Sequence, residues 1–324
     1  MSDEQRKPSG TTLHLLEPPR AAGRGRESSL FAWSELRRLG RVEPGPVVLV
    51  GDGMSARWAA AHGIEPDARL TPPAGRSGLL WPRLRRLARD VRPDAIRCWS
   101  PDLLRACALA PGLHGTELRG TVVEGPNARD RRLRGRLRRA TVIETFDERD
   151  AEDWRSLGLT VRTVELGDSP APTPSDDRAA LQAQIGVSSD ELLLGTLFDH
   201  PADTDARRFS FLLAILAVSE HDAVGVVPSG ARRIEAGRRY ARVINREYRV
   251  LESDAPLIEQ LRALDACVIP DPTRRLPRGA DLLLRRAAAR AGVRAYERPA
   301  YLGVSGPTAP EMIRPMLDVL EGAA

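Results

Sequence analysis

A group of acidic, basic and histidine side chains follows the first apolar run in the second half of the chain. Leu192–Leu197 leads into Asp199 and His200, and Arg207 and Arg208 come just before the next apolar stretch. The helix dipole gives arginine no reason to sit in a first helical turn. Guanidinium groups there suit an anion such as a diphosphate, and the alternative is a plain solvated turn. His200 could titrate near neutral pH or could complete a hydrogen-bond network.

Two later loops of the second half end apolar runs in a similar way. Ala223–Val227 is followed by Pro228, Ser229 and Gly230, whose backbone could approach a ligand closely, and Ala266–Ile269 is followed by Asp271. Open α/β sheets bind ligands beyond the carboxyl ends of their strands. We therefore expect these loops to share one ligand-binding edge.

The first half offers two glycine-containing turns. Gly23, Arg24 and Gly25 precede a helix expected from Ser28, which suits an anionic or polyhydroxyl ligand or a surface loop. Residues 51–56 match the dinucleotide pattern G-x-G-x-x-A, but they follow the second strand and lack an acidic residue after the third. We interpret residues 51–56 as a tight strand-to-helix turn, with cofactor binding as the alternative.

Searches for metal and nucleophile motifs give no candidate. The five histidines are not spaced as metal ligands, and neither a G-x-S-x-G elbow nor a P-loop is present. Cys98, Cys107 and Cys267 lack CxxC spacing and are predicted to be buried thiols. We predict no metal and no cofactor.

Alternating strands and helices must position these loops. Apolar runs and helical patterns alternate in both halves, which is typical of parallel sheets with crossover helices. A Pro-, Ser- and Asp-rich stretch at Gly167–Arg178 separates the halves. The predicted fold is α/β, with two Rossmann-like parallel-sheet lobes facing a cleft. The predicted borders are 1–167 for the N-terminal lobe, 168–178 for a linker, 179–307 for the C-terminal lobe and 308–324 for a helix that packs back on the first lobe.

Strands are expected at Thr12–Leu16, Val47–Val50, Ala68–Thr71, Asp94–Trp99, Leu118–Val123, Ala140–Glu144, Thr160–Glu165, Leu192–Leu197, Ala223–Val227, Tyr248–Leu251, Ala266–Ile269 and Val293–Tyr296. Helices are expected at Ser28–Leu39, Ser55–His62, Leu79–Val91, Pro101–Leu109, Asp130–Arg138, Asp147–Leu157, Asp203–Ser219, Ala231–Ile244, Ala255–Leu264, Ala280–Ala291 and Pro310–Glu321.

The composition is that of a globular protein, with 42% hydrophobic and 29% charged residues. The N-terminus is polar, and no window approaches the roughly 18 apolar residues of a membrane span, so a cytoplasmic location is expected. The net charge is +5, and all basic residues except Lys7 are arginines. Arg129–Arg139 is predicted to be a helix with a cationic face, either solvated or in contact with an anionic surface. Aromatic residues are sparse, which argues against a nucleic-acid partner.

In the order of its segments, the chain resembles a glycosyltransferase of the GT-B fold, family 4-like. Val91–Trp99 is similar to an acceptor-side segment of that family, and Gly23–Glu27 is similar to its glycine-rich acceptor loop. Leu181–Val187 with the following strand, and Leu261–Pro270, are similar to segments beside its donor site.

The resemblance implies transfer of a sugar from a nucleotide-diphosphate donor to a carbohydrate or lipid-linked acceptor, without a metal. In that interpretation Arg207 and Arg208 hold the diphosphate, Asp271 or Asp281 contacts sugar or ribose hydroxyls, and Glu124 acts on the reacting side. The family's two glutamates, seven residues apart, should fall in Arg278–Gly292, where Asp281 is the only acidic residue. The alternative is therefore a catalytically inactive GT-B protein that binds a sugar or nucleotide or serves as a scaffold.

Overall fold

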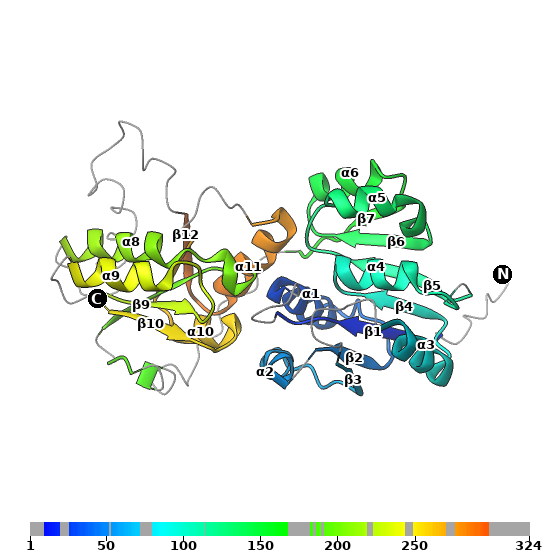
Figure 1. The fold of residues 1–324 in the computed structure, drawn as a ribbon, viewed down its shortest axis with the longest axis horizontal. Coiled ribbons are helices and arrows are strands. Elements are labelled where there is room, and N and C mark those ends of the chain that lie inside the picture. The colour runs from blue at the N-terminus through cyan, green and yellow to red at the C-terminus, as the bar shows by residue number, and fades with distance from the viewer. Residues whose placement is uncertain are drawn as a thin grey trace. The chain divides into compact units, whose positions relative to one another are not determined.

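The computed structural model describes residues 10–19, 26–51, 53–71, 80–113, 115–167, 182–183, 186–188, 191–218, 223–243, 249–269 and 276–297 (Figure 1). The chain divides into two compact units, unit 1 comprising Met1–Asp168 with Pro277–Leu283 and unit 2 comprising Ser169–Leu276 with Leu284–Ala324. The predicted linker and the predicted C-terminal helix lie outside the described residues. The predicted domain borders therefore stay a prediction.

The described part of unit 1 is built on a parallel sheet of seven strands, in the order β3-β2-β1-β4-β5-β6-β7. β1 lies between β2 and β4, with Leu15 opposite Val48 and Cys98. The order reverses between β1 and β4, which creates a topological switch point at the carboxyl edge. The strands are β1 (Thr12–Leu16), β2 (Val47–Val50), β3 (Ala68–Leu70), β4 (Ala95–Cys98), β5 (Glu117–Thr121), β6 (Ala140–Thr145) and β7 (Val161–Thr163).

The connections in unit 1 are helices, and their capping residues explain where several begin. Ser100 accepts a hydrogen bond from the Leu103 amide at 3.2 Å, and Pro101 occupies the first helical position of α4. Asn127 and Asp130 form a capping box at the start of α5. The helices are α1 (Glu27–Arg38), α2 (Gly53–Ala61), α3 (Leu80–Val91), α4 (Pro101–Leu109), α5 (Ala128–Leu137) and α6 (Glu148–Arg155).

Unit 2 repeats this plan with five described strands, all parallel, in the order β10-β9-β8-β11-β12. Its switch point lies between β8 and β11. The strands are β8 (Leu192–Thr196), β9 (Ala223–Pro228), β10 (Arg249–Ser253), β11 (Ala266–Ile269) and β12 (Arg294–Glu297). The helices are the short 3-10 helix η2 (Pro201–Asp203), α8 (Ala206–Val218), α9 (Ile234–Val243), α10 (Leu257–Ala263) and α11 (Arg278–Arg290), whose first residues belong to unit 1.

Each unit has its own hydrophobic core. In unit 1 one sheet face packs against α3, α4 and α5, through residues such as Leu84, Leu104 and Leu137. In unit 2 Phe209 and Leu213 of α8 pack against β8 and β9. The predicted pair of Rossmann-like parallel-sheet lobes is confirmed. Among the described helices, none has the length and apolar composition needed to cross a bilayer.

One predicted helix begins later than expected. The sequence placed a helix from Asp203, whereas the chain forms η2 at Pro201–Asp203 and starts α8 only at Ala206. His200 caps η2, and Asp205 accepts a hydrogen bond from the Arg208 amide at 3.4 Å at the start of α8. Two successive caps therefore divide what the pattern indicated as one helix.

Candidate functional site

The loops that follow β8 and β9 are joined at the carboxyl edge of the unit 2 sheet. The Arg232 amide donates to the Thr204 carbonyl at 2.8 Å, and the Ala206 amide donates to the Arg232 carbonyl at 2.9 Å. The Arg232 side chain also donates to the Ala202 carbonyl at 3.0 Å. The structure therefore brings the start of α8 and the loop after β9 to the same edge, as the sequence predicts.

Predicted donor-side residues occupy this edge in different environments. Asp199 lies in the loop after β8 and is fully buried. His200 Nδ1 accepts a hydrogen bond from the Ala202 amide at 3.2 Å, so the ring caps η2. Arg207 is exposed in the first turn of α8, whereas Arg208 is half-buried.

The loop after β9 keeps space open beside the start of α8. Gly230 has φ +86°, and a Cβ placed there would meet only Pro201, at 3.7 Å. The preceding Ser229 amide donates to the Ser253 carbonyl at 2.8 Å and ties this turn to β10. A positive φ favours glycine, and the absence of a side chain at Gly230 leaves this backbone turn open to a ligand.

A buried carboxylate changes the electrostatics of the α8 N-terminus. Asp205 is 2% exposed, accepts from the Arg208 amide and lies 3.5 Å from Arg233 Nη1. It therefore uses a backbone donor that an anionic ligand could otherwise take. The sequence pattern did not reveal this cap, because the predicted helix Asp203–Ser219 includes Asp205.

The remaining predicted residues of this group either lie outside the described residues or belong to unit 1. Asp271 lies outside the described residues, as do Gly23, Arg24 and Gly25 of the predicted acceptor loop. Asp281 lies in the first turn of α11, in the segment Pro277–Leu283 that belongs to unit 1.

Glu124, the predicted reacting-side residue, lies just beyond β5 at the carboxyl edge of the unit 1 sheet. Its carboxylate is 3.1 Å from Arg26 Nε, and its backbone carbonyl accepts from Trp154 Nε1 at 2.8 Å. About a quarter of each side chain in the Glu124–Arg26 pair is exposed. Because Arg26 directly precedes α1, the pair joins the β5 loop to the start of that helix. A half-buried carboxylate held in this way can accept a hydrogen bond or a proton from a hydroxyl.

A second carboxylate lies at the start of α1. Glu27 Oε1 is 3.0 Å from His62 Nε2, and both side chains are buried. Phe31 packs edge-on against the imidazole, with ring centroids 4.6 Å apart. Sequence reasoning missed this pair because its members are separated by 35 positions and no motif links them.

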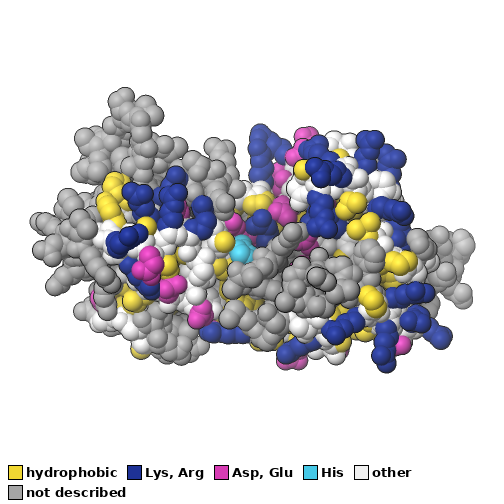
Figure 2. All heavy atoms as spheres, viewed as in Figure 1, with side chains coloured by type: hydrophobic (Ala, Val, Ile, Leu, Met, Phe, Trp, Pro, Cys, Tyr) yellow, Lys and Arg dark blue, Asp and Glu magenta, His cyan; other side chains and the backbone are white. Residues whose placement is uncertain are grey.

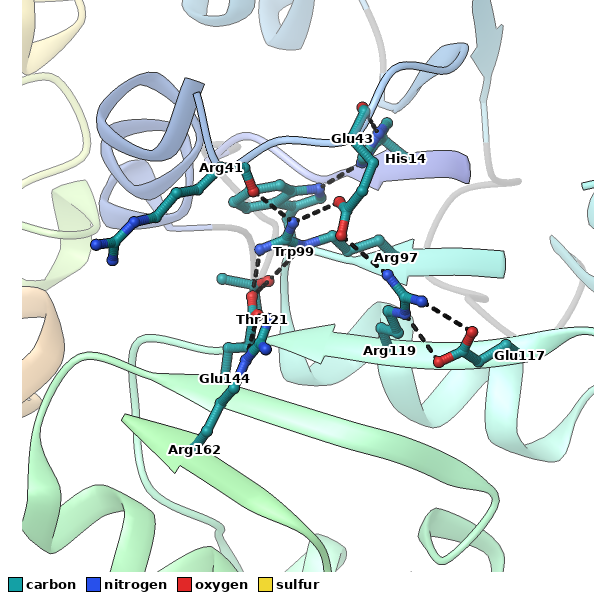
Figure 3. Close-up of polar contacts among 10 residues, drawn as sticks. All are labelled: His14, Arg41, Glu43, Arg97, Trp99, Glu117, Arg119, Thr121, Glu144 and Arg162. Carbon is teal, nitrogen blue, oxygen red and sulfur yellow. Dashed lines mark hydrogen bonds and ion pairs between the residues drawn. The ribbon is translucent and has the colours of Figure 1, made fainter. Parts of the chain in front are cut away.

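Behind the carboxyl edge, a charged network crosses one face of the unit 1 sheet (Figure 3). Arg97 on β4 is 2% exposed and donates to Thr121 Oγ1 at 2.9 Å, to Glu43 at 2.7 Å and to Glu144 on β6. Its guanidinium carbon lies 4.5 Å from the centre of the Trp99 ring. The network ties β4, β5 and β6 together near the ends from which the site loops depart.

The charges of the network fix the ionisation of its members. Burial alone would raise the pKa of Glu43, but Arg97 and Arg119 outweigh burial and lower it. Burial lowers the pKa of His14 to about 4. His14 Nε2 faces the Glu43 carbonyl at 2.8 Å, and its Nδ1 faces the Trp99 indole nitrogen at 3.4 Å. A neutral imidazole with its proton on Nε2 satisfies both contacts.

One feature of the sequence indicates this network, namely polar residues within apolar strands. Arg97 stands in the middle of the apolar run Asp94–Trp99, and His14 stands in the middle of Thr12–Leu16. A polar group inside an otherwise buried strand requires partners.

Known proteins resemble this chain in fold but not in sequence. No family model and no curated protein sequence matches the chain. Among solved structures, Anabaena HepE in complex with UDP-glucose is 14% identical, with a TM-score of 0.60 over 97% of this chain and 90% of that one. The UDP-GlcNAc 2-epimerase of Methanocaldococcus jannaschii is 10% identical, with a TM-score of 0.58 over 96% and 92%.

A third neighbour is the E. coli ADP-heptose lps heptosyltransferase II, 16% identical, with a TM-score of 0.55 over 97% of this chain and all of that one. At these identities the likeness concerns the fold alone, and the narrower resemblance to family 4 stays a prediction. The chain therefore has the GT-B type of fold, with two Rossmann-like lobes.

Proposed function

We propose that this protein binds a nucleotide-diphosphate sugar at the carboxyl edge of the unit 2 sheet and transfers the sugar to an acceptor hydroxyl. The observation that carries the proposal is the junction of the β8 and β9 loops at the start of α8, made by the backbone hydrogen bonds of Arg232. This junction lies beside the switch point, where open α/β sheets bind their ligands. The GT-B fold, shared with a structure that holds UDP-glucose, supports the same ligand class.

In this proposal the donor phosphates are held mainly by side chains. Asp205 already accepts from an amide at the start of α8, so Arg207 and Arg208 supply the positive charge that the diphosphate needs. The open turn at Gly230 leaves room for the nucleotide, and Ser229 lies beside it. Asp271 or Asp281 would accept hydrogen bonds from sugar or ribose hydroxyls, as the resemblance to glycosyltransferases implies.

The transfer step breaks the bond between the sugar C1 and the diphosphate oxygen, which leaves with the electron pair. The acceptor hydroxyl oxygen forms the new bond to C1, and its proton passes to the Glu124 carboxylate. Arg207 and Arg208 neutralise the charge that develops on the departing diphosphate. Gly23, Arg24 and Gly25 would contact the acceptor, a carbohydrate or a lipid-linked sugar.

A second candidate function is sugar-nucleotide binding without catalysis. It is favoured by the absence of glutamate in Arg278–Gly292 and by the carboxylate of Asp205 at the α8 N-terminus. The first feature removes side chains that the family uses in transfer. The second lowers the positive electrostatic potential available to the departing diphosphate. The two candidates share the binding site and differ only in turnover.

A thermal-shift panel of UDP, GDP, ADP and their sugars tests the shared binding claim. A ligand at about 100 times its dissociation constant stabilises the folded state by about 2.7 kcal/mol. Arg208→Ala should reduce the shift strongly. Arg134→Ala, which removes an exposed arginine of α5, is the matched control and should leave the shift unchanged. No shift with any of these ligands, or equal losses in both variants, would contradict the proposed site.

Product analysis separates the two candidates. With the nucleotide sugar that gives the largest shift, an active transferase releases the free nucleoside diphosphate, and Glu124→Gln slows this release without removing the thermal shift. If the protein binds the nucleotide sugar but releases no nucleoside diphosphate with any of a panel of sugar and lipid-linked acceptors, the result would support binding without catalysis.

A further inference from the structure

Helices α3 and α5 concentrate the positive charge of the chain. Residues 80–92 and 128–139 together contain twelve arginines and two aspartates, a surplus of ten positive charges. The whole chain has a net charge of only +5, so the rest of the molecule is net negative. The basic character of this protein is therefore local.

The two helices flank α4 on the same side of the unit 1 sheet. Leu84 of α3, Leu104 of α4 and Leu137 of α5 belong to one hydrophobic core, so the outer sides of these helices point away from the sheet together. We call this outer side the arginine face. Figure 2 shows dark blue basic side chains gathered where Figure 1 places α3 and α5. The exposed arginines of the face are Arg83, Arg85, Arg86 and Arg89 of α3 and Arg129, Arg131, Arg132, Arg134 and Arg136 of α5.

Three arginines on the other side of the sheet differ from those of the arginine face in having carboxylate partners. Arg97, Arg119 and Arg162 each form an ion pair with a glutamate. In the part of the chain that the structure describes, no carboxylate forms an ion pair with an exposed arginine of the arginine face. The arginines of the arginine face thus carry charge that no described ion pair compensates.

The acidic residue of α5, Asp130, is buried and does not offset the charge of the exposed arginines. Asp130 is 1% exposed, lies 2.5 Å from Arg105 Nη1 and accepts from the Asn127 amide at 2.9 Å. Arg132 and Arg136 are four positions apart on the same helix, a spacing at which like charges repel. An anionic partner would relieve this repulsion, which the helix carries when free.

We propose that the arginine face docks unit 1 onto an anionic phospholipid surface. Guanidinium groups match phosphate oxygens in geometry as well as charge. The arginine rows of α3 and α5 are separated by α4, hence by roughly 20 Å at usual helix spacings, and a planar layer of headgroups contacts both rows at once. The attachment is electrostatic, because no large apolar side chain described on α3, α4 or α5 is exposed. Of the two helices that form the arginine face, α5 contains no aromatic residue and α3 contains one, Trp81, which is fewer than the stacking platform of a single-stranded nucleic-acid site needs.

Vesicle sedimentation with the full chain tests this proposal. Binding is measured at low salt to vesicles of phosphatidylcholine alone and to vesicles that also contain phosphatidylglycerol. The test variant is Arg131→Gln/Arg132→Gln/Arg136→Gln. The control is Arg69→Gln/Arg262→Gln/Arg294→Gln, which removes the same charge from exposed positions outside the arginine face.

We expect binding to the anionic vesicles alone and its loss at about 0.5 M salt, where the Debye length is short. The test variant should bind at least about tenfold more weakly, and the control should bind like the unmodified protein. Equal weakening in both variants would overturn the proposal, since it would reflect overall charge. Absence of vesicle binding would also overturn it, and salt-sensitive binding to a nucleic-acid duplex in that case would assign the arginine face to another partner.

Discussion

At the scale of residues, Arg97 shows how a buried charge is made tolerable. Its guanidinium has carboxylate partners in Glu43 and Glu144, a hydroxyl partner in Thr121 and the Trp99 ring beside it. Each carboxylate also pairs with a second arginine, Glu43 with Arg119 and Glu144 with Arg162, so the buried charges share their counter-charges. The network therefore depends on all its members together.

Arg97→Met should lower the free energy of unfolding by about 1–3 kcal/mol, because Glu144 loses a buried donor and keeps only the largely exposed Arg162 as its cationic partner. Urea unfolding followed by circular dichroism measures the loss. The exposed control Arg69→Met should change stability by no more than about 0.5 kcal/mol. A loss no larger than that of the control would show that the network contributes little.

His14 gives unit 1 a dependence on pH with a defined sign. Burial lowers its folded-state pKa from 6.5 to about 4, so the unfolded chain takes up the proton first. The stabilisation is present above pH 6.5 and is lost as the pH falls towards 4.

Between pH 7 and pH 4.5 the unmodified protein should lose about 2–3 kcal/mol more stability than His14→Gln, which lacks this titration. Urea unfolding of both proteins at the two pH values gives the difference directly. Identical losses would mean that His14 is not the group responsible.

At the scale of elements, apolar runs bounded by turn residues predicted most of the secondary structure. The bounds of β1, β2, β11 and α4 agree with the predicted ranges. The predicted start of α8 was wrong, because Asp203 and Asp205 are both suitable N-cap residues. The η2 turn at Pro201–Asp203 leaves Asp205 as the cap. The partners of Arg97 could not be predicted, since they come from segments whose pairing depends on strand order rather than on any local pattern.

Glycines decide how closely α8 approaches the unit 2 sheet. A Cβ at Gly225 on β9 would lie 2.4 Å from Leu213 and 2.7 Å from Phe209, both buried side chains of α8. Gly225→Ala should therefore destabilise the protein by about 1–3 kcal/mol.

Gly135→Ala is the matched control, because a Cβ there meets nothing within 4 Å on the exposed side of α5. It should raise stability by about 0.5–1 kcal/mol through helix propensity. Thermal unfolding compares the two variants, and a stable Gly225→Ala protein would contradict the packing described for α8.

At the scale of the whole molecule, two units repeat one sheet order, and each has a switch point at its carboxyl edge. The sequence predicted two parallel-sheet lobes. It also predicted that Asp199, Arg208 and Gly230 follow strands at the carboxyl edge of the unit 2 sheet. The sequence did not reveal that Asp205 caps α8, so the proposed phosphate contacts now rest on the arginine side chains.

Hydrogen exchange with and without a nucleotide-diphosphate sugar tests whether the ligand binds at the carboxyl edge of the unit 2 sheet. We expect slowed exchange at residues 197–208 and 229–233 of unit 2, where the β8 and β9 loops meet, and we expect Arg208→Ala to abolish the effect. Protection confined to residues 51–57 of unit 1, or no protection at saturating ligand, would contradict it.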